Sequence, residues 1–348
     1  MMSYPKHLAA GYPSAAEEKQ RQAESFTIEF PSRPPTPLSH KKSPFTTILG
    51  GIRHELNVSE RLLRSNAVGF LFIFLGGLLA RFIRAPPPTL AEGVRGTVIT
   101  LALDLLCSYV FEVCNQATSP EEDFLNKPYR PIPAGLLTVA QLKTRWALAW
   151  TLGPLALFHF FGPWAMTYLL AYEATIAFCY VWPGWLSWIL RNLFVAQVYF
   201  FQVRLLNQVL GHAVPVPGWD FDLLIDLAVS VWFLCTIHVQ EFHDLEGDRE
   251  SGRVTLPALL SPRGLRFLRA GTALYTVVFA VALAFVGYQR ISEHILVVPM
   301  SLLQLGTSAL LAYRVWASNS PQMDKVTYHV YYYIPALFIL LELALVTK

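Results

Sequence analysis

Long apolar runs are the feature of this chain that most restricts what it can fold into. Each is close to the 20 residues or so that a helix needs to cross the hydrocarbon of a bilayer. These runs lie near residues 66–83, 96–115, 139–160, 163–181, 184–206, 221–240, 266–288, 293–313 and 327–346. Pro163, Pro183 and Gly184 divide the middle of the chain into separate helices, because Pro and Gly interrupt helical runs. We therefore expect an all-α integral membrane protein with about nine transmembrane helices.

The overall composition supports a membrane protein and excludes one class of partner. Hydrophobic residues make up 54% of the 348 residues and charged residues only 15%, whereas a soluble domain carries about a quarter charged residues. The net charge is +3 and the basic residues are scattered along the chain. Without a concentrated basic stripe, we expect no nucleic acid partner.

The first 45 residues differ from everything after them. They are rich in Pro, Ser, Lys and Glu, and they lack the apolar core of a signal peptide. This composition predicts a disordered cytosolic tail over residues 1–45 and a transmembrane domain over residues 46–348. The alternative is a cleaved organelle-targeting peptide, which Glu17, Glu18 and Glu24 disfavour because such peptides avoid acidic residues.

Two acidic loops follow the second and the sixth apolar runs. They read NQATSPEEDFLNKPYRPIP at 115–133 and QEFHDLEGDRESGRVTLP at 240–257, with carboxylates first and cationic side chains after them. That order suits a metal-bound anion, because carboxylates hold Mg²⁺ while Lys and Arg hold phosphate oxygens. Nine spans place both loops on the side of the N-terminus. Loops on that side carry the larger number of Lys and Arg residues, which predicts that it faces the cytosol.

The second loop has three acidic residues at helical spacing. Asp244 and Asp248 are four residues apart and Glu241 lies three before Asp244, so a continuous helix would place all three on one face. Such a patch needs a cation between its members. The alternative is a solvated loop in which Asp244 forms salt bridges with Arg249 or Arg253.

The first loop is less regular than the second. Its acids at 121–123 are consecutive and cannot all face one way. Asn115 offers a neutral oxygen ligand, and the cationic Lys127 and Arg130 follow among prolines that stiffen the backbone. A lone acidic run of this kind is usually a solvated turn, and the second loop is what favours a functional interpretation.

The segments NKPYRPIPAG at 126–135 and HDLEGDRESGRVTLP at 243–257 together resemble the UbiA superfamily of intramembrane prenyltransferases. The resemblance extends from about residue 60 to residue 346. It implies a bundle of nine transmembrane helices around a central cavity that is open to lipid. It also implies that two aspartate-rich loops cap the cavity and bind Mg²⁺ and an isoprenyl diphosphate.

The family's motifs can be placed on this chain residue by residue. Asn115 stands for the asparagine of the first motif and Asp123 for its last aspartate, but Gln116 and Ser119 replace two acids, and Glu241 replaces an aspartate in the second motif. The resemblance implies metal contacts from Asn115, Glu122, Asp123, Glu241, Asp244 and Asp248, diphosphate contacts from Asn115, Lys127, Arg130, Arg249 and Arg253, and catalytic importance for Asp123, Asp244 and Asp248.

The altered first motif is similar to that of a divergent fungal branch of the superfamily. That branch includes membrane-bound terpene cyclases that act on farnesyl diphosphate, so we expect cyclisation to a sesquiterpene in fungal secondary metabolism. Aromatic faces stabilise carbocations, and Tyr109, Phe111 and Tyr199 are candidates for that role. The alternative is transfer of the prenyl group to an aromatic or polyketide acceptor, for which Arg191 is the nearest candidate cation.

A third alternative lies outside the enzymes. A membrane transporter or scaffold that merely keeps acidic loops would turn over no diphosphate. Two loops that each pair acids with Lys or Arg argue against it. We expect a protein of the endoplasmic reticulum or another endomembrane.

Overall fold

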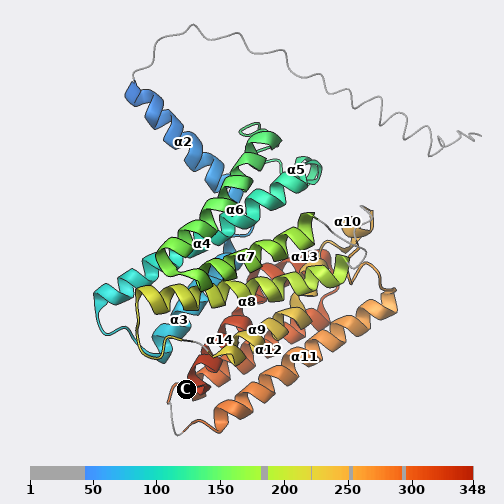
Figure 1. Ribbon diagram of the computed structural model, residues 1–348. Coiled ribbons are helices and arrows are strands. Elements are labelled where there is room, and N and C mark those ends of the chain that lie inside the picture. Colours follow the sequence, from blue (N-terminus) through green and yellow to red (C-terminus); the bar gives the residue numbers. More distant parts are fainter. Residues whose placement is uncertain (1–43, 182–186, 221, 251–253, 292–294, 348) are drawn as a thin grey trace, which may run out of the picture. The chain divides into compact units, whose positions relative to one another are not determined.

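The computed structural model describes residues 44–181, 187–220, 222–250, 254–291 and 295–347, and every regular element in these ranges is helical (Figure 1). The predicted tail therefore lies almost entirely outside the described residues. The chain divides into two compact units, residues 1–52 and 53–348. The helix over residues 44–63 crosses the boundary between them, and every later element belongs to the second unit.

The helices are named as in Figure 1. The α-helices are α2 (Pro44–Leu63), α3 (Ala67–Arg84), α4 (Leu90–Thr118), α5 (Pro120–Asn126), α6 (Val139–Phe161), α7 (Pro163–Ile176), α8 (Ser187–Ala213), α9 (Leu223–Thr236), α10 (Leu245–Glu250), α11 (Pro262–Tyr288), α12 (Val297–Ala317), α13 (Pro321–Val326) and α14 (Tyr333–Val346). Two π-helical turns, η1 (Ala177–Val181) and η3 (Thr327–Tyr331), and one 3₁₀ turn, η2 (Ile237–Glu241), extend α7, α13 and α9.

Local sequence explains where these helices begin and end. α4 starts with a capping box, in which the Glu92 backbone N–H donates to Thr89 Oγ1 at 3.2 Å and the Thr89 backbone N–H donates to Glu92 Oε2 at 3.1 Å. α6 ends at Gly162, whose φ of 86° lies in the left-handed region that favours glycine, and Pro163 then opens α7. The predicted break between 160 and 163 is thus confirmed. The second predicted break, at Pro183 and Gly184, lies outside the described residues.

Where the structure describes them, the predicted membrane-spanning ranges fall mainly on helical residues. Within the described part of the chain, six helical stretches are long and apolar enough to cross a membrane: 67–84, 90–118, 188–213, 223–241, 262–288 and 321–346. The all-helical, integral membrane architecture is confirmed, and the count of nine spans stays a prediction.

The outer surface of the second unit carries many large apolar side chains. On α11 alone, Leu274, Val278, Val281 and Phe285 are more than half exposed. Contiguous apolar surface of this kind is unusual on a soluble monomer, and it is what a helix in contact with lipid presents.

Both acidic loops lie at the same end of the helices. Near the start of α3, the Phe70 ring lies 5.8 Å from that of Phe111, close to the end of α4. Phe72 lies 6.1 Å from Phe233, close to the end of α9. The ends of α4 and α9 therefore meet the same end of α3, and Figure 1 shows α5 and α10, which follow them, at one end of the bundle. The expected convergence of the loops is borne out, whereas their cytosolic orientation stays a prediction.

Candidate functional site

The first loop is organised around a buried ion pair. α5 begins with Pro120, and its single pair of turns brings Asp123 towards the chain that follows. Arg130 Nη1 lies 2.7 Å from Asp123 Oδ1, and both residues are only 2% exposed. A charge-assisted hydrogen bond in so dry a setting fixes both side chains. The structure thus brings these two predicted site residues together.

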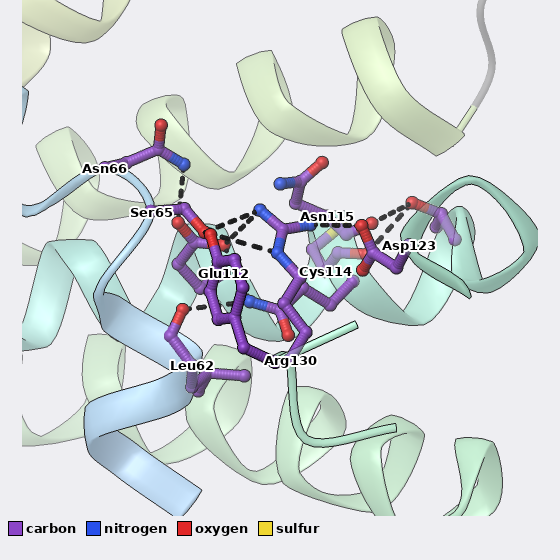
Figure 2. A network of polar contacts seen from close by, with 11 residues as sticks. Leu62, Ser65, Asn66, Glu112, Cys114, Asn115, Asp123 and Arg130 are labelled. Carbon is purple, nitrogen blue, oxygen red and sulfur yellow. Dashed lines mark hydrogen bonds and ion pairs between the residues drawn. The ribbon is translucent and has the colours of Figure 1, made fainter. Parts of the chain in front are cut away.

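The other side of the Arg130 guanidinium contacts residues far away in the sequence. Nε and Nη2 donate to Ser65 Oγ at 3.2 and 3.1 Å, and Nη2 lies 3.7 Å from Glu112 Oε2. Figure 2 shows Arg130 between Asp123 on one side and Ser65 and Glu112 on the other. Arg130 therefore ties the first loop to α4 and to the turn that precedes α3.

Glu112 is a site residue that was not expected from the sequence. It is fully buried near the end of α4, where it accepts hydrogen bonds from Asn66 Nδ2 at 2.5 Å and Gln116 Nε2 at 3.0 Å. A carboxylate inside an apolar run, four residues before an amide, is the signal that points to it, because ionisable groups in membrane helices are rarely without a function.

Gln116 stands where the first motif of the resembled family has an acid, and the contacts of its amide explain the difference. Its Nε2 donates both to Glu112 Oε2 and to the Leu62 carbonyl oxygen, at 2.9 Å for the latter. An ionised aspartate has no hydrogen to donate and would repel Glu112. The amide at this position thus holds the Glu112–Arg130 network together instead of supplying a metal ligand.

The remaining predicted residues of the first loop differ in their surroundings. Asn115 is half-buried and interacts with Glu112. Lys127 is half-buried, and its ammonium makes no polar contact with the part of the chain that the structure describes. That leaves its charge available to an anion. The side chain of Glu122 lies outside the description.

The second loop does not form the continuous acidic face that its spacing predicts. η2 ends at Glu241 and α10 begins only at Leu245, so the helix is interrupted between Glu241 and Asp248. Glu241 and Asp248 are buried, whereas the Asp244 side chain is 65% exposed and lies 3.4 Å from His243 Nε2. The prediction of one shared face was wrong, because the chain turns between the acids.

Asp248 is held in place by a neighbour from the other side of the loop. Thr255 is fully buried and its Oγ1 donates to Asp248 Oδ2 at 3.1 Å. Arg249, by contrast, is exposed and donates to the Ala258 and Leu260 carbonyl oxygens, at 3.4 and 2.9 Å. These two hydrogen bonds hold the loop closed. They take the place of the salt bridge between Asp244 and Arg249 that the sequence offered as an alternative. Arg253 lies outside the described residues.

Helices from the C-terminal part of the chain support the second loop. Arg269 on α11 binds both carboxylate oxygens of Asp324, at 2.8 and 2.7 Å, and its guanidinium lies 4.0 Å from the centre of the Phe242 ring. Tyr328 donates to Gln240 Oε1 at 3.2 Å. These contacts were not predicted, since they join residues 27 to 88 positions apart.

Two clusters of aromatic rings lie next to the ends of α4 and α9. The Phe111 ring lies 5.4 Å from Tyr180 and 5.6 Å from Phe194, in addition to Phe70. The second cluster comprises Phe72, Tyr199, Trp232, Phe233, Tyr332 and Tyr333. Phe111 and Tyr199, two of the predicted aromatic candidates, are therefore inside the bundle, while Tyr109 is half-buried.

The carboxylates of the two loops fit a hard divalent cation whose coordination shell is completed by a bound substrate. No three His, Cys, Asp or Glu side chains come together as a metal site within the described ranges. Mg²⁺ typically takes one or two carboxylates and completes its shell with water and substrate phosphates. Asp123 and Asp248 are buried carboxylates on the two loops and are the residues that would hold such an ion.

Comparison with known proteins agrees with these features. A sequence model described as the UbiA prenyltransferase family matches residues 70–340. The chain is 31% identical over 252 residues to the diterpene cyclase eriG of Hericium erinaceus, covering 72% of this chain and 75% of the relative. It is 30% identical over 236 residues to the polyprenyl transferase eriF of the same fungus, covering 67% and 76%. Somaliensene A/B synthase of Streptomyces somaliensis is 29% identical over 299 residues, covering 82% and 91%.

Proposed function

We propose, from the premise that this chain belongs to the UbiA prenyltransferase family, that it ionises an isoprenyl diphosphate with the help of Mg²⁺ and cyclises the resulting cation. The family implies a prenyl diphosphate substrate and a membrane setting. Its relatives include named cyclases and a transferase, so the chain is an enzyme of terpene cyclase or prenyltransferase type. Farnesyl diphosphate is the substrate we propose, with a sesquiterpene as the product.

The two loops would act as a clamp on the diphosphate. Asp123 and Asp248 hold negative charge at the loops, and Lys127 presents an ammonium with no polar partner among the described residues. Arg130 orients Asp123 through the 2.7 Å contact. Bound Mg²⁺ would supply electrophilic stabilisation of the leaving pyrophosphate. The side chains of the loops position that leaving group and keep it away from the apolar interior.

The observation that carries the cyclase proposal is the position of the aromatic clusters. Phe111 lies one helical turn before Asn115, and Phe233 lies eight residues before Glu241. Rings this close to the loops would lie beside the first part of an isoprenyl chain whose diphosphate is bound at the loops. Their faces stabilise a carbocation without reacting with it, and the surrounding buried apolar side chains exclude the water that would trap it as an alcohol.

One observation favours the runner-up, transfer to an aromatic or polyketide acceptor. Arg81 on α3 is fully buried, and its Nη1 donates to the Gly77 carbonyl oxygen at 2.7 Å. The sequence alone pointed instead to Arg191, whose side chain lies outside the description. A buried cation is what an acidic acceptor needs. The similarity to the polyprenyl transferase eriF points the same way.

The products formed without an acceptor distinguish the two activities. Purified protein with Mg²⁺ and farnesyl diphosphate alone should give a cyclic hydrocarbon that gas chromatography detects. Geranylgeranyl diphosphate belongs in the same experiment, because one similar protein is named a diterpene cyclase. If pyrophosphate appears only after an aromatic compound is added, and the product carries that ring, the transferase is the correct assignment.

The proposal also places the loops on the cytosolic face of the endoplasmic reticulum or another endomembrane. The excess of Lys and Arg on the loop side supports this orientation. A cysteine introduced at Ser119 should react with an impermeant reagent added to sealed microsomes. Reaction only after the microsomes are opened would contradict it.

A further inference from the structure

A stripe of buried polar side chains runs along α4 away from the first loop. It consists of residues four apart in sequence, Thr100, Asp104, Ser108, Glu112 and Gln116, which are 0, 6, 5, 0 and 0% exposed. Consecutive members lie one turn apart on the helix, and because four residues turn it by about 400°, the row drifts by about 40° around α4 at each step. From Gln116 to Thr100 the stripe extends about 24 Å. Polar groups within a membrane bundle are costly and mark functional paths.

The polar groups at the two ends of this stripe differ in whether they have hydrogen-bond partners. Near the loop, Glu112 and Gln116 bind each other, and Glu112 also binds Asn66. Deeper in the bundle, Asp104 Oδ1 and Thr100 Oγ1 have no hydrogen-bond partner among the described residues. A buried carboxyl oxygen without a partner costs free energy. The deeper half of the stripe is thus prepared for a group that the described residues do not supply.

A second buried acid lies on a neighbouring helix. Glu173 on α7 is 4% exposed, and its Oε1 also has no hydrogen-bond partner within the described ranges. α7 meets α4 where the Tyr172 hydroxyl donates to the Cys107 carbonyl oxygen at 3.2 Å. Asp104 lies three residues before Cys107 on α4, and Glu173 directly follows Tyr172 on α7. The two acids therefore lie around the same turn of α4.

The distance along α4 between Asp104 and the first loop shows how this acid pair relates to the candidate site. Asp104 is 11 residues from Asn115, which is about 16 Å along the helix. Phe111 and its aromatic cluster lie between the two. From the first loop inward along α4, the loop carboxylates come first, the aromatic rings come next, and Asp104 and Glu173 come last. An isoprenoid chain anchored by its diphosphate would meet these groups in that order.

Resting on the proposed cyclase activity, we propose that Asp104 and Glu173 form a second site, which contacts the isoprenoid chain and accepts the proton that ends the cyclisation. The allylic C–O bond breaks and its electron pair leaves with pyrophosphate. An alkene of the same chain closes the ring and moves the positive charge. A C–H bond next to that charge then breaks, its electrons form the new double bond, and the proton passes to a carboxylate oxygen of the pair. Water at the loop end removes the proton before the next turnover.

The test uses two isosteric variants that remove the acid, Asp104→Asn and Glu173→Gln, and measures two quantities. Pyrophosphate release reports ionisation at the loops and should stay within about threefold of wild type, because loss of a proton acceptor affects a later step. The share of the wild-type hydrocarbon should fall about tenfold in at least one variant, replaced by isomeric hydrocarbons or alcohols. Asp222→Asn, which removes an exposed carboxylate at the start of α9, should change neither quantity.

A conservative variant separates chemistry from packing. Glu173→Asp keeps an acid and should restore most of the wild-type hydrocarbon relative to Glu173→Gln. Unchanged product profiles in both isosteric variants would overturn the proposal, as would a Glu173→Asp profile altered as much as an altered Glu173→Gln profile. So would a loss of pyrophosphate release with the profile preserved. A failure of the cyclase assignment shows itself separately, as a wild-type protein that makes no hydrocarbon from isoprenyl diphosphate alone.

Discussion

Asp248→Ala is expected to abolish measurable turnover of the isoprenyl diphosphate. Asp248 is a buried carboxylate, oriented by Thr255 at 3.1 Å, and we propose that it holds the metal-bound diphosphate. Removing one preorganised electrostatic contact to a charge that develops in the transition state typically costs about 10²- to 10³-fold in rate. Because the metal would be lost with its ligand, we expect the upper end of this range. Pyrophosphate release by purified protein measures it.

Two neighbouring acids accompany Asp248→Ala, one as a control and one as a further test. Glu246 on the same short helix is exposed, and Glu246→Ala should stay close to the wild-type rate. Asp244→Ala tests whether an exposed acid joins the site only when substrate is bound. Near-wild-type rates in both Asp244→Ala and Asp248→Ala would show that the metal assignment for the second loop is wrong.

Arg130→Lys is expected to lose activity although it keeps the charge. Arg130 contacts Asp123 with one nitrogen while two others reach Ser65 Oγ. A lysine ammonium is a single point and cannot make both sets of contacts. Hydrogen bonds that involve a charged group contribute about 1.5–3 kcal/mol, which corresponds to roughly 10- to 100-fold in rate if they are needed in the transition state.

Thermal stability gives the Arg130 variant a second readout. Glu112 and Asp123 are both buried against Arg130. A lysine ammonium at position 130 can approach only one of these carboxylates, and leaving the other buried charge uncompensated is strongly destabilising. We expect Arg130→Lys to lower the melting temperature in detergent as well as the rate. Arg64→Lys is the matched control, because Arg64 is exposed and pairs only loosely with Glu60 at 3.7 Å. A wild-type rate and melting temperature for Arg130→Lys would reduce Arg130 to an ordinary basic loop residue.

Much of the fold was predictable because it depends on local properties. Apolar length determines which segments become helices, and Gly162 with Pro163 separates α6 from α7. The convergence of the two loops followed from the order of the spans. The helix α2 was not expected, because its residues fall between the predicted tail and the first long apolar run.

The candidate site was less predictable because it depends on contacts between distant segments. Ser65 and Asn66 reach Arg130 and Glu112 across 65 and 46 positions, and no spacing rule connects them. Gln116 looked like a lost metal ligand until its two acceptors were known. The acids of the second loop do not share one face because the helix is interrupted after Glu241, where Arg269 and Tyr328 from distant helices contact Phe242 and Gln240.

The most direct test of the central proposal, that both loops hold one metal-bound diphosphate, is pyrophosphate release from isoprenyl diphosphate without any acceptor. We expect purified wild-type protein to release pyrophosphate with Mg²⁺ and to stop when EDTA removes the metal. Asp123→Asn and Asp248→Asn, one in each loop, should both raise the Mg²⁺ concentration needed for half-maximal release. Release that continues in EDTA, or a Mg²⁺ requirement that changes in only one of the two variants, would contradict it.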